Sequence, residues 1–204
     1  MSTPFYQSAR RHLSRNCPVM KRIIARVGPC TLKPNPDDPF TLLVRCVIYQ
    51  QISTKAAKSI FEKLTSAVGG PSVPLAKLSR MTEAQFRSCG VSGPKQRTLR
   101  AVVEHVRANP DLLPGLADRD DDTIRGQLTE IKGIGPWTVD MLLMFGIARP
   151  DVLAVGDYGI RVAVQRQFNL RKLPDAAKIT RIAEPWQPYR SVACWYLWRS
   201  LEVK

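Results

Sequence analysis

A single carboxylate, Asp157, lies in the short segment VGDYGIR, among apolar residues and glycines. A lone carboxylate can stabilise positive charge that develops in a transition state, and it can orient or deprotonate a water molecule. Asp is also a preferred N-cap residue, so the same side chain can cap a helix that starts at Tyr158. Both roles can hold at once, because a cap position fixes the carboxylate. Asp157 is therefore the first candidate for chemistry.

A glycine turn precedes this carboxylate in the segment LTEIKGIGPWTVDMLLMFG, Leu128 to Gly146, which ends eleven residues upstream of Asp157. The segment reads as helix, tight turn, helix. Gly133 and Gly135 allow positive φ and close approach of another backbone, and Pro136 suits the first position of a helix. Such a turn presents backbone N–H groups to a phosphate without reading sequence. A plain helical hairpin has the same pattern, so the turn alone does not decide between the two.

The rest of the chain also has a helical pattern, and no segment shows strict apolar and polar alternation. We predict an all-α fold with no internal repeats. The acidic run Asp118–Asp122 is expected in a solvated loop and helix cap. The expected helical segments are 40–52, 53–70, 82–90, 94–109, 121–131, 136–146, 158–168, 175–184 and 188–203.

Charge and cysteine content narrow the function classes. The chain has 31 Lys and Arg against 17 Asp and Glu, a formal net charge of +14, which favours a polyanionic partner. No run of 18 apolar residues and no basic amphipathic helix of the membrane-surface type occur, so nucleic acid is favoured over a membrane in an intracellular protein. The five cysteines have no Cys-x-x-Cys spacing, which predicts free buried thiols and neither a zinc site nor an iron–sulfur cluster.

Several motifs in order carry a family resemblance. LTEIKGIGPWTVDMLLMF followed by AVGDYGIR resembles the helix-hairpin-helix and Gly/Pro-Asp signature of the HhH-GPD DNA glycosylase superfamily. Within it, the chain is most similar to the AlkA-like 3-methyladenine DNA glycosylase II family. Further matching segments are LVRCVIYQQISTKAA, GVSGPKQRTLRAV and PWQPYRSVACWYLW, so the resemblance covers about residues 38 to 200.

The resemblance implies a two-lobed helical HhH-GPD fold with the active-site cleft between the lobes. Residues 41–148 would form one lobe that ends in the hairpin. Residues 1–40 plus 149–204 would form the other lobe and carry Asp157 as the catalytic carboxylate. The residues before position 38 match only loosely.

The implied activity is that of a monofunctional DNA glycosylase in base excision repair. Such an enzyme flips out an alkylated purine of the 3-methyladenine or 7-methylguanine type and hydrolyses its N-glycosidic bond, leaving an abasic site. A purine alkylated at N3 or N7 is positively charged and leaves without a strong general acid, which suits a motif with one carboxylate. Relatives with lyase activity carry a lysine in the second helix of the hairpin, and Trp137 stands at that position here.

The resemblance also assigns further site residues. Trp137, Met141, Tyr158 and Trp198 would line the base pocket, whereas Trp195 is expected in the core. Gln51 would enter the gap left by the flipped base, with Gln50 as its neighbour. Main-chain carbonyls of Thr129, Ile131 and Ile134 would hold a sodium or potassium ion, and no organic cofactor is implied. The predicted contacts to the DNA backbone are Gly133, Ile134, Gly135, Thr138, Lys95, Arg97 and Arg161.

Other functions fit parts of the pattern. A glycosylase of the same fold could act on uracil, hypoxanthine or an oxidised base. A non-catalytic module could use the hairpin as a DNA clamp, and a basic adaptor could bind RNA, although a single-strand stacking motif is missing. The expected partner is double-stranded DNA with a damaged base, bound by a monomer with no membrane association. The expected compartment is the cytoplasm, at the nucleoid, in a bacterium and the nucleus in a eukaryote.

Overall fold

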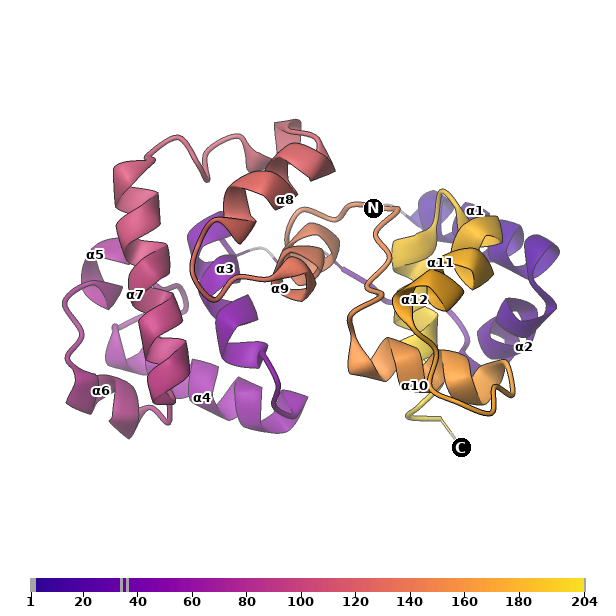
Figure 1. Ribbon diagram of the computed structural model, residues 1–204, viewed down its shortest axis with the longest axis horizontal. Helices are drawn as coiled ribbons and strands as arrows, with labels where there is room; N and C mark the ends of the chain where they lie inside the picture. Colours follow the sequence, from indigo (N-terminus) through magenta and orange to yellow (C-terminus); the bar gives the residue numbers. More distant parts are fainter. Residues whose placement is uncertain (1–2, 34, 36, 204) are drawn as a thin grey trace. The chain divides into compact units, whose positions relative to one another are not determined.

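The computed structural model describes residues 3–33, 35 and 37–203. This part of the chain folds into helices and loops and contains no β-strand, which confirms the predicted all-α class. The chain divides into two compact units (Figure 1). One unit is Asn35–Leu142, and the other combines Met1–Pro34 with Leu143–Lys204. The division into functional lobes, 41–148 on one side and 1–40 with 149–204 on the other, remains a prediction.

The unit Asn35–Leu142 is built around α3 (Pro39–Tyr49), which packs against α4, α7 and α9. This helix is apolar almost throughout, so it buries most of its surface and forms the centre of the unit. The other elements are α4 (Thr54–Ala67), α5 (Leu75–Leu78), α6 (Glu83–Ser88), α7 (Gly93–Ala108), η1 (Leu116–Asp118), α8 (Asp121–Thr129) and α9 (Pro136–Met141).

Side-chain caps start several of these helices where the sequence predicts. Ser53 accepts a hydrogen bond from the backbone N–H of Ala56 and begins α4. Thr82 and Gln85 form a reciprocal capping box at the start of α6. Asp120 caps α8 through the N–H of Thr123, and hydrogen bonds from Thr123 lower the pKa of its carboxyl. These caps satisfy N–H groups that have no partner inside the helix.

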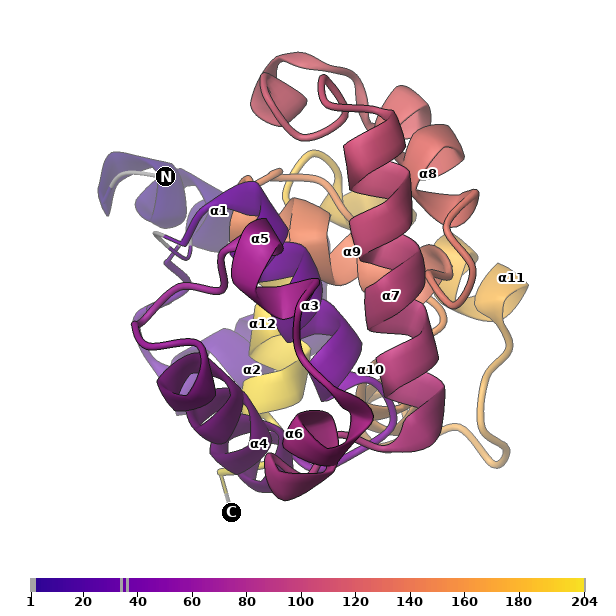
Figure 2. The same cartoon turned by 90° about the vertical axis from the view of Figure 1, so that its left-hand side faces the viewer.

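The unit of Met1–Pro34 and Leu143–Lys204 is built around α12 (Arg190–Arg199), which packs against both α2 and α10 (Figure 2). Every residue of α12 from Ser191 to Leu197 is buried, and Trp195 belongs to this core as predicted. The other elements are α1 (Thr3–Asn16), α2 (Pro18–Val27), most of the π-helical turn η2 (Leu142–Gly146), α10 (Tyr158–Gln167), α11 (Ala176–Ala183) and η3 (Glu184–Trp186).

The five cysteines are free thiols. Burial raises the pKa of Cys30 to about 11 and that of Cys46 to about 12. Both side chains are therefore protonated at neutral pH, and neither is a nucleophile.

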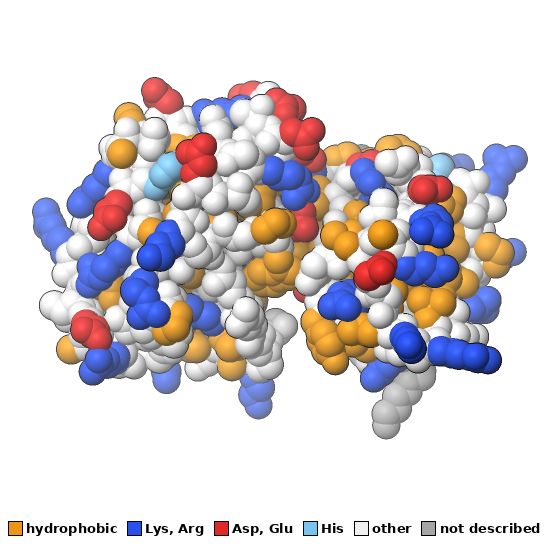
Figure 3. All heavy atoms as spheres, in the orientation of Figure 1, with side chains coloured by type: hydrophobic (Ala, Val, Ile, Leu, Met, Phe, Trp, Pro, Cys, Tyr) orange, Lys and Arg blue, Asp and Glu red, His pale blue; other side chains and the backbone are white. Residues whose placement is uncertain are grey.

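Charge is distributed unevenly on the face drawn in Figure 3. Figure 3 shows Lys and Arg side chains spread over both units, while Asp and Glu side chains gather at the upper edge of Asn35–Leu142. The run Asp118–Asp122 is mostly exposed in η1, the following loop and the start of α8, as predicted. Among the described residues, no helix is long and apolar enough to cross a membrane.

Candidate active site

Asp157 occupies the N-cap position of α10 and also accepts a bond from a tryptophan. Its Oδ1 accepts a hydrogen bond of 2.8 Å from the backbone N–H of Ile160 and another of 2.8 Å from the indole Nε1–H of Trp198. The cap holds the carboxylate relative to α10, and the indole holds it relative to α12. The carboxylate is therefore fixed by two helices of one unit, and both roles weighed for Asp157 can operate together.

Glycine at position 159 makes this arrangement fit. A Cβ atom at Gly159 would lie 3.0 Å from Asp157 Oδ1 and 3.1 Å from Trp198 Cδ1. Both distances are short for a carbon contact, so a larger residue would push the indole or the carboxylate away. On another side, the Phe145 ring lies 5.7 Å from the Trp198 ring, centroid to centroid. Gly159 and Phe145 were not predicted as site residues, since nothing in the sequence reveals their contact with Trp198.

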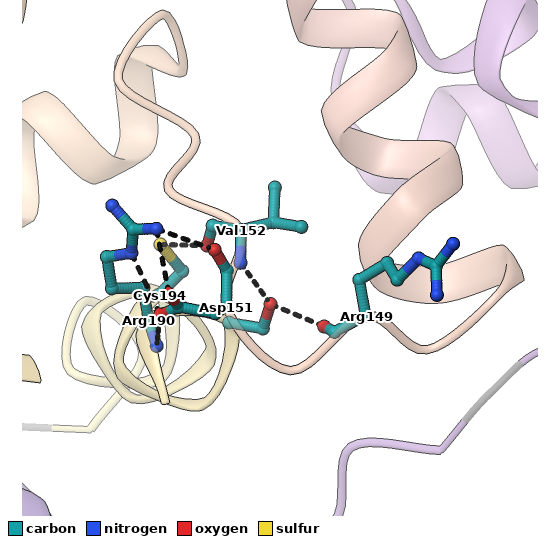
Figure 4. Close-up of polar contacts among 6 residues, drawn as sticks. Arg149, Asp151, Val152, Arg190 and Cys194 are labelled. Carbon is teal, nitrogen blue, oxygen red and sulfur yellow. Dashed lines mark hydrogen bonds and ion pairs between the residues drawn. The ribbon is translucent and has the colours of Figure 1, made fainter. Parts of the chain in front are cut away.

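The loop that leads to Asp157 is fastened to the start of α12 (Figure 4). Arg190 binds the Asp151 carboxylate in a bidentate ion pair, through Nε and Nη2, with both distances 2.8 Å. Ser191 Oγ donates to the carbonyl of Arg149 and accepts from the N–H of Val152. A planar guanidinium matched to a carboxylate fixes orientation as well as distance. The loop is thus held in place at residues 149–152, a short distance before Asp157 in the sequence.

The predicted hairpin connects α8 to α9, and Pro136 begins α9 as expected. Gly133 has φ +92°, and a Cβ atom there would lie 2.1 Å from Thr98 Oγ1 of α7. Glycine is therefore required at this position by both conformation and space. Arg125 and Asp140 join the two helices of the hairpin by an ion pair of 2.6 Å.

The two glycines of the hairpin keep backbone N–H donors for a ligand. Within the described ranges, the N–H groups of Gly133 and Gly135 donate to no protein acceptor. The N–H of Ile134 is bonded to the Ile131 carbonyl, and that of Thr138 to the Gly135 carbonyl. The Thr138 side chain is only 2% exposed. DNA-backbone contact remains a prediction for Gly133 and Gly135, whereas internal bonding disfavours it for Ile134 and Thr138.

The two predicted wedge glutamines differ in geometry. Gln50 donates from Nε2 to the Gly133 carbonyl and to Thr138 Oγ1, so it ties the end of α3 to the hairpin. Gln51 is exposed and has φ +55°, an uncommon value for a residue with a side chain. Ile52 beside it is 38% exposed, which the sequence analysis did not single out. Gln51 and Ile52 therefore form an exposed tip, with Gln50 as its anchor.

The predicted pocket residues fall into two pairs, one in each unit. Trp137 and Met141 lie four residues apart on α9, and Met141 is buried with 8% exposure. Tyr158 follows Asp157 directly and is 71% exposed, and Trp198 is bonded to Asp157. An exposed aromatic ring next to the carboxylate can stack on a flat, electron-poor base.

The three predicted basic contacts are placed unequally. Lys95 Nζ donates to the carbonyl of Ile48 at 2.7 Å, and burial lowers its pKa. Arg161 Nε donates to the carbonyl of Pro174 at 3.0 Å. Arg97 is exposed near the start of α7. Arg97 is therefore better placed than Lys95 or Arg161 for the phosphate contact, which stays a prediction for all three.

An all-helical fold with a Gly-Ile-Gly hairpin, followed by a capping carboxylate, defines the class of helix-hairpin-helix proteins that act on DNA. The model of the HhH-GPD superfamily base excision DNA repair proteins matches residues 44–188. The chain belongs to this family, as its motifs predicted.

Relatives with known names are similar over nearly the whole chain. DNA-3-methyladenine glycosylase 1 of Schizosaccharomyces pombe is 32% identical, and the match covers 96% of this chain and 87% of that protein. The solved structure of Schizosaccharomyces pombe 3-methyladenine DNA glycosylase (Mag1) in complex with abasic DNA has a TM-score of 0.88 and 31% identity, covering 96% of this chain and 97% of that one. DNA-3-methyladenine glycosidase of Bacillus halodurans has a TM-score of 0.75 and 34% identity, covering 92% and 85%.

Proposed function

We propose that this chain is a monofunctional DNA glycosylase of the 3-methyladenine type, which acts in base excision repair. The observation that carries the proposal is the Asp157 carboxylate, held at the start of α10 by the Ile160 N–H and the Trp198 indole. Relatives named 3-methyladenine glycosylases match nearly the full chain, and one of them was solved with abasic DNA. DNA is thus the partner, and a duplex with a damaged base is the proposed substrate.

The proposed reaction depends on the charges of the carboxylate, the sugar and the alkylated purine. As the bond between base and sugar breaks, positive charge develops on the deoxyribose, and the Asp157 carboxylate stabilises it. The alkylated purine leaves with the bonding electrons and so loses its positive charge. A water oxygen bonds to the anomeric carbon, and its proton passes to the carboxylate or to solvent. The products are a free base and an abasic site.

Release of alkylated bases is the experiment that tests this function. Duplexes that each carry one lesion are incubated with the protein and then treated with alkali, which cuts the strand at abasic sites. We expect cutting at 3-methyladenine and 7-methylguanine analogues, because these bases leave as neutral molecules. Cutting only at uracil, hypoxanthine or an oxidised base would assign another substrate. Binding without any cutting would indicate a non-catalytic clamp.

The second prediction concerns cleavage of the DNA strand. Without alkali, we expect no strand cleavage and no covalent adduct when borohydride is added. The position where lyase-competent relatives carry a lysine holds Trp137, which has no amine to attack the sugar. Gel analysis of end-labelled duplexes, with and without alkali, makes this measurement. A borohydride-stabilised adduct between protein and DNA would contradict it.

The third prediction concerns the exposed tip next to α3. We expect Gln51→Gly to keep or slightly raise stability, by up to about 1 kcal/mol, because glycine adopts positive φ without strain. The same variant should excise about tenfold more slowly if the side chain fills the gap left by the flipped base, since unstacking costs a few kcal/mol. Single-turnover kinetics and thermal unfolding of the same preparation separate the two effects. Unchanged excision would remove Gln51 from the wedge.

A monovalent cation in the hairpin is a further part of the proposal. Thr129 is the last residue of α8, so its carbonyl lies where a helix leaves acceptors unpaired. The Ile131 carbonyl accepts the N–H of Ile134 and keeps a second lone pair. The carbonyls of Thr129, Ile131 and Ile134 would then hold sodium or potassium and stiffen the turn. We also propose that the protein works as a monomer, at the nucleoid in a bacterium or in the nucleus in a eukaryote.

A further inference from the structure

Among their charged side chains, the first 36 residues have only basic ones. They contain seven Lys and Arg and no Asp or Glu, so they supply +7 of the net +14. This segment precedes residues 44–188, which the family model matches, and the catalytic proposal does not use it. Within it, α1 and α2 pack against each other. No acidic side chain within these 36 residues can neutralise the positive charge.

A groove of about 560 Å³ opens on these helices. It is lined by Gln7, Arg10, Arg11 and Ser14 of α1 and by Ile24 of α2. The Nε of Arg10 is buried without a hydrogen-bond partner, and neither Arg10 nor Arg11 has an ion-pair or hydrogen-bond partner among the described residues. A buried guanidinium nitrogen is normally paired, so the unpartnered Nε of the half-buried Arg10, with the exposed Arg11 beside it, indicates an anionic ligand.

The spacing of the lining residues suits a phosphate backbone. Gln7, the Arg10–Arg11 pair and Ser14 follow each other at helical spacing along one face of α1. Seven residues of helix span about 10 Å, which is the axial rise of about three nucleotides of one strand. Guanidinium groups bind phosphate oxygens in a bidentate manner, and amide and hydroxyl groups add donors.

The surface lacks what other anionic partners need. The exposed large hydrophobic side chains of the described chain are Ile52, Tyr158 and Val203, and none of them lies on α1 or α2. Binding to a lipid surface needs apolar side chains that enter the acyl region, and a stable protein interface needs aromatic or aliphatic anchors. Backbone phosphates need only charge and donors. A nucleic acid is therefore the favoured occupant.

The groove is separate from the carboxylate within its unit. Asp157 begins α10, and α12 lies between α10 and α2 (Figure 2). We propose that the α1–α2 groove binds the phosphate backbone of a second nucleic-acid segment, distinct from the segment that holds the excised base. Two segments held at once would let the protein pass from one stretch of DNA to another without full release.

The test uses the full chain and a double variant, Arg10→Gln with Arg11→Gln. The matched control is Arg171→Gln with Lys172→Gln, which removes the same charge from two exposed residues in the loop after α10 of the same unit. Protein is first saturated with a short unlabelled abasic duplex, and a labelled undamaged duplex is then titrated and followed by anisotropy. We expect the wild type and the control to bind the second duplex. The groove variant should bind it about tenfold to a hundredfold more weakly, with a salt slope smaller by about two.

Further readouts separate the outcomes. Single-turnover excision from a short lesion duplex and thermal unfolding should match the wild type in both double variants, which excludes misfolding. The proposal would be overturned if both double variants lost binding of the second duplex equally. It would also be overturned if the groove variant kept that binding. Selective loss of binding to phosphatidylserine vesicles or polyglutamate, with duplex binding intact, would overturn it in favour of a membrane or an acidic protein. Titration with undamaged duplex alone does not depend on excision, so failure of the proposed glycosylase activity would remain distinguishable.

Discussion

Asp157→Asn is expected to abolish base release while DNA binding stays intact or improves. The amide has the size of the carboxylate and can still accept the Ile160 N–H through its oxygen, so the cap of α10 is preserved. It cannot offset the positive sugar of the transition state or take a proton from water. Electrostatic stabilisation by one group is worth about 3–4 kcal/mol, so excision should slow by at least about a hundredfold to a thousandfold. Binding should not weaken, because one negative charge beside a polyanion is removed.

Asp175→Asn provides the matched control. Asp175 caps α11 through the N–H of Lys178 at 2.8 Å, as Asp157 caps α10, but it is exposed and bonded to no tryptophan. Both variants lose one carboxylate and keep one cap. Single-turnover excision on the same lesion duplex should be normal for Asp175→Asn and lost for Asp157→Asn. Near-normal excision by Asp157→Asn would leave that carboxylate as a helix cap alone.

Gly133→Ala should have the second largest effect, first on stability and through it on DNA binding. A side chain at φ +92° costs about 1–2 kcal/mol, and the added Cβ would overlap Thr98 Oγ1 at 2.1 Å. Relieving an overlap in a packed interior costs about 1–3 kcal/mol more. Denaturant unfolding should therefore show a loss of about 2–5 kcal/mol. Displacement of the turn should also weaken binding to any duplex, lesion or not.

Gly135→Ala separates structure from ligand contact in the same turn. Gly135 has φ −110°, and a Cβ atom there would have nothing within 4 Å, so alanine should fold like the wild type. If a phosphate approaches the Gly135 N–H closely, the methyl group should still weaken DNA binding. Equal stability of Gly133→Ala and the wild type would show that the turn tolerates a side chain. Wild-type binding by Gly135→Ala would mean that the phosphate does not approach this residue.

From residue 39 onward, most helix starts followed from local chemistry and were predicted from the sequence, whereas α1, α2 and the short α5 were not predicted. Ser53, Thr82 and Pro136 each act on the first turn of a helix, within a few residues of themselves. The apolar run of α3 predicted a buried helix, and α3 is the centre of its unit. The π-helical turn Leu142–Gly146 was missed, because its residues have the same apolar pattern as an ordinary helix.

Contacts between residues distant in the sequence could not be predicted from local patterns. The glycine at 133 was explained by turn conformation, but its closest neighbour is Thr98 of α7, which no spacing rule links to the hairpin. Trp198 was predicted to line the base pocket, and its indole N–H is bonded to Asp157. Gln50 was predicted beside the wedge, and it is bonded to the hairpin. Each of these contacts depends on how helices pack.

The most direct test of the central claim is single-turnover release of free 3-methyladenine from methylated duplex DNA, measured by mass spectrometry. Wild-type protein, Asp157→Asn and Asp175→Asn are compared at equal concentrations, with binding to the same duplex measured in parallel. We predict release by the wild type and by Asp175→Asn, and none above the no-enzyme level by Asp157→Asn while it still binds the duplex. No release by the folded wild type, or wild-type release by Asp157→Asn, would contradict the claim that Asp157 is the catalytic carboxylate of an alkylbase glycosylase.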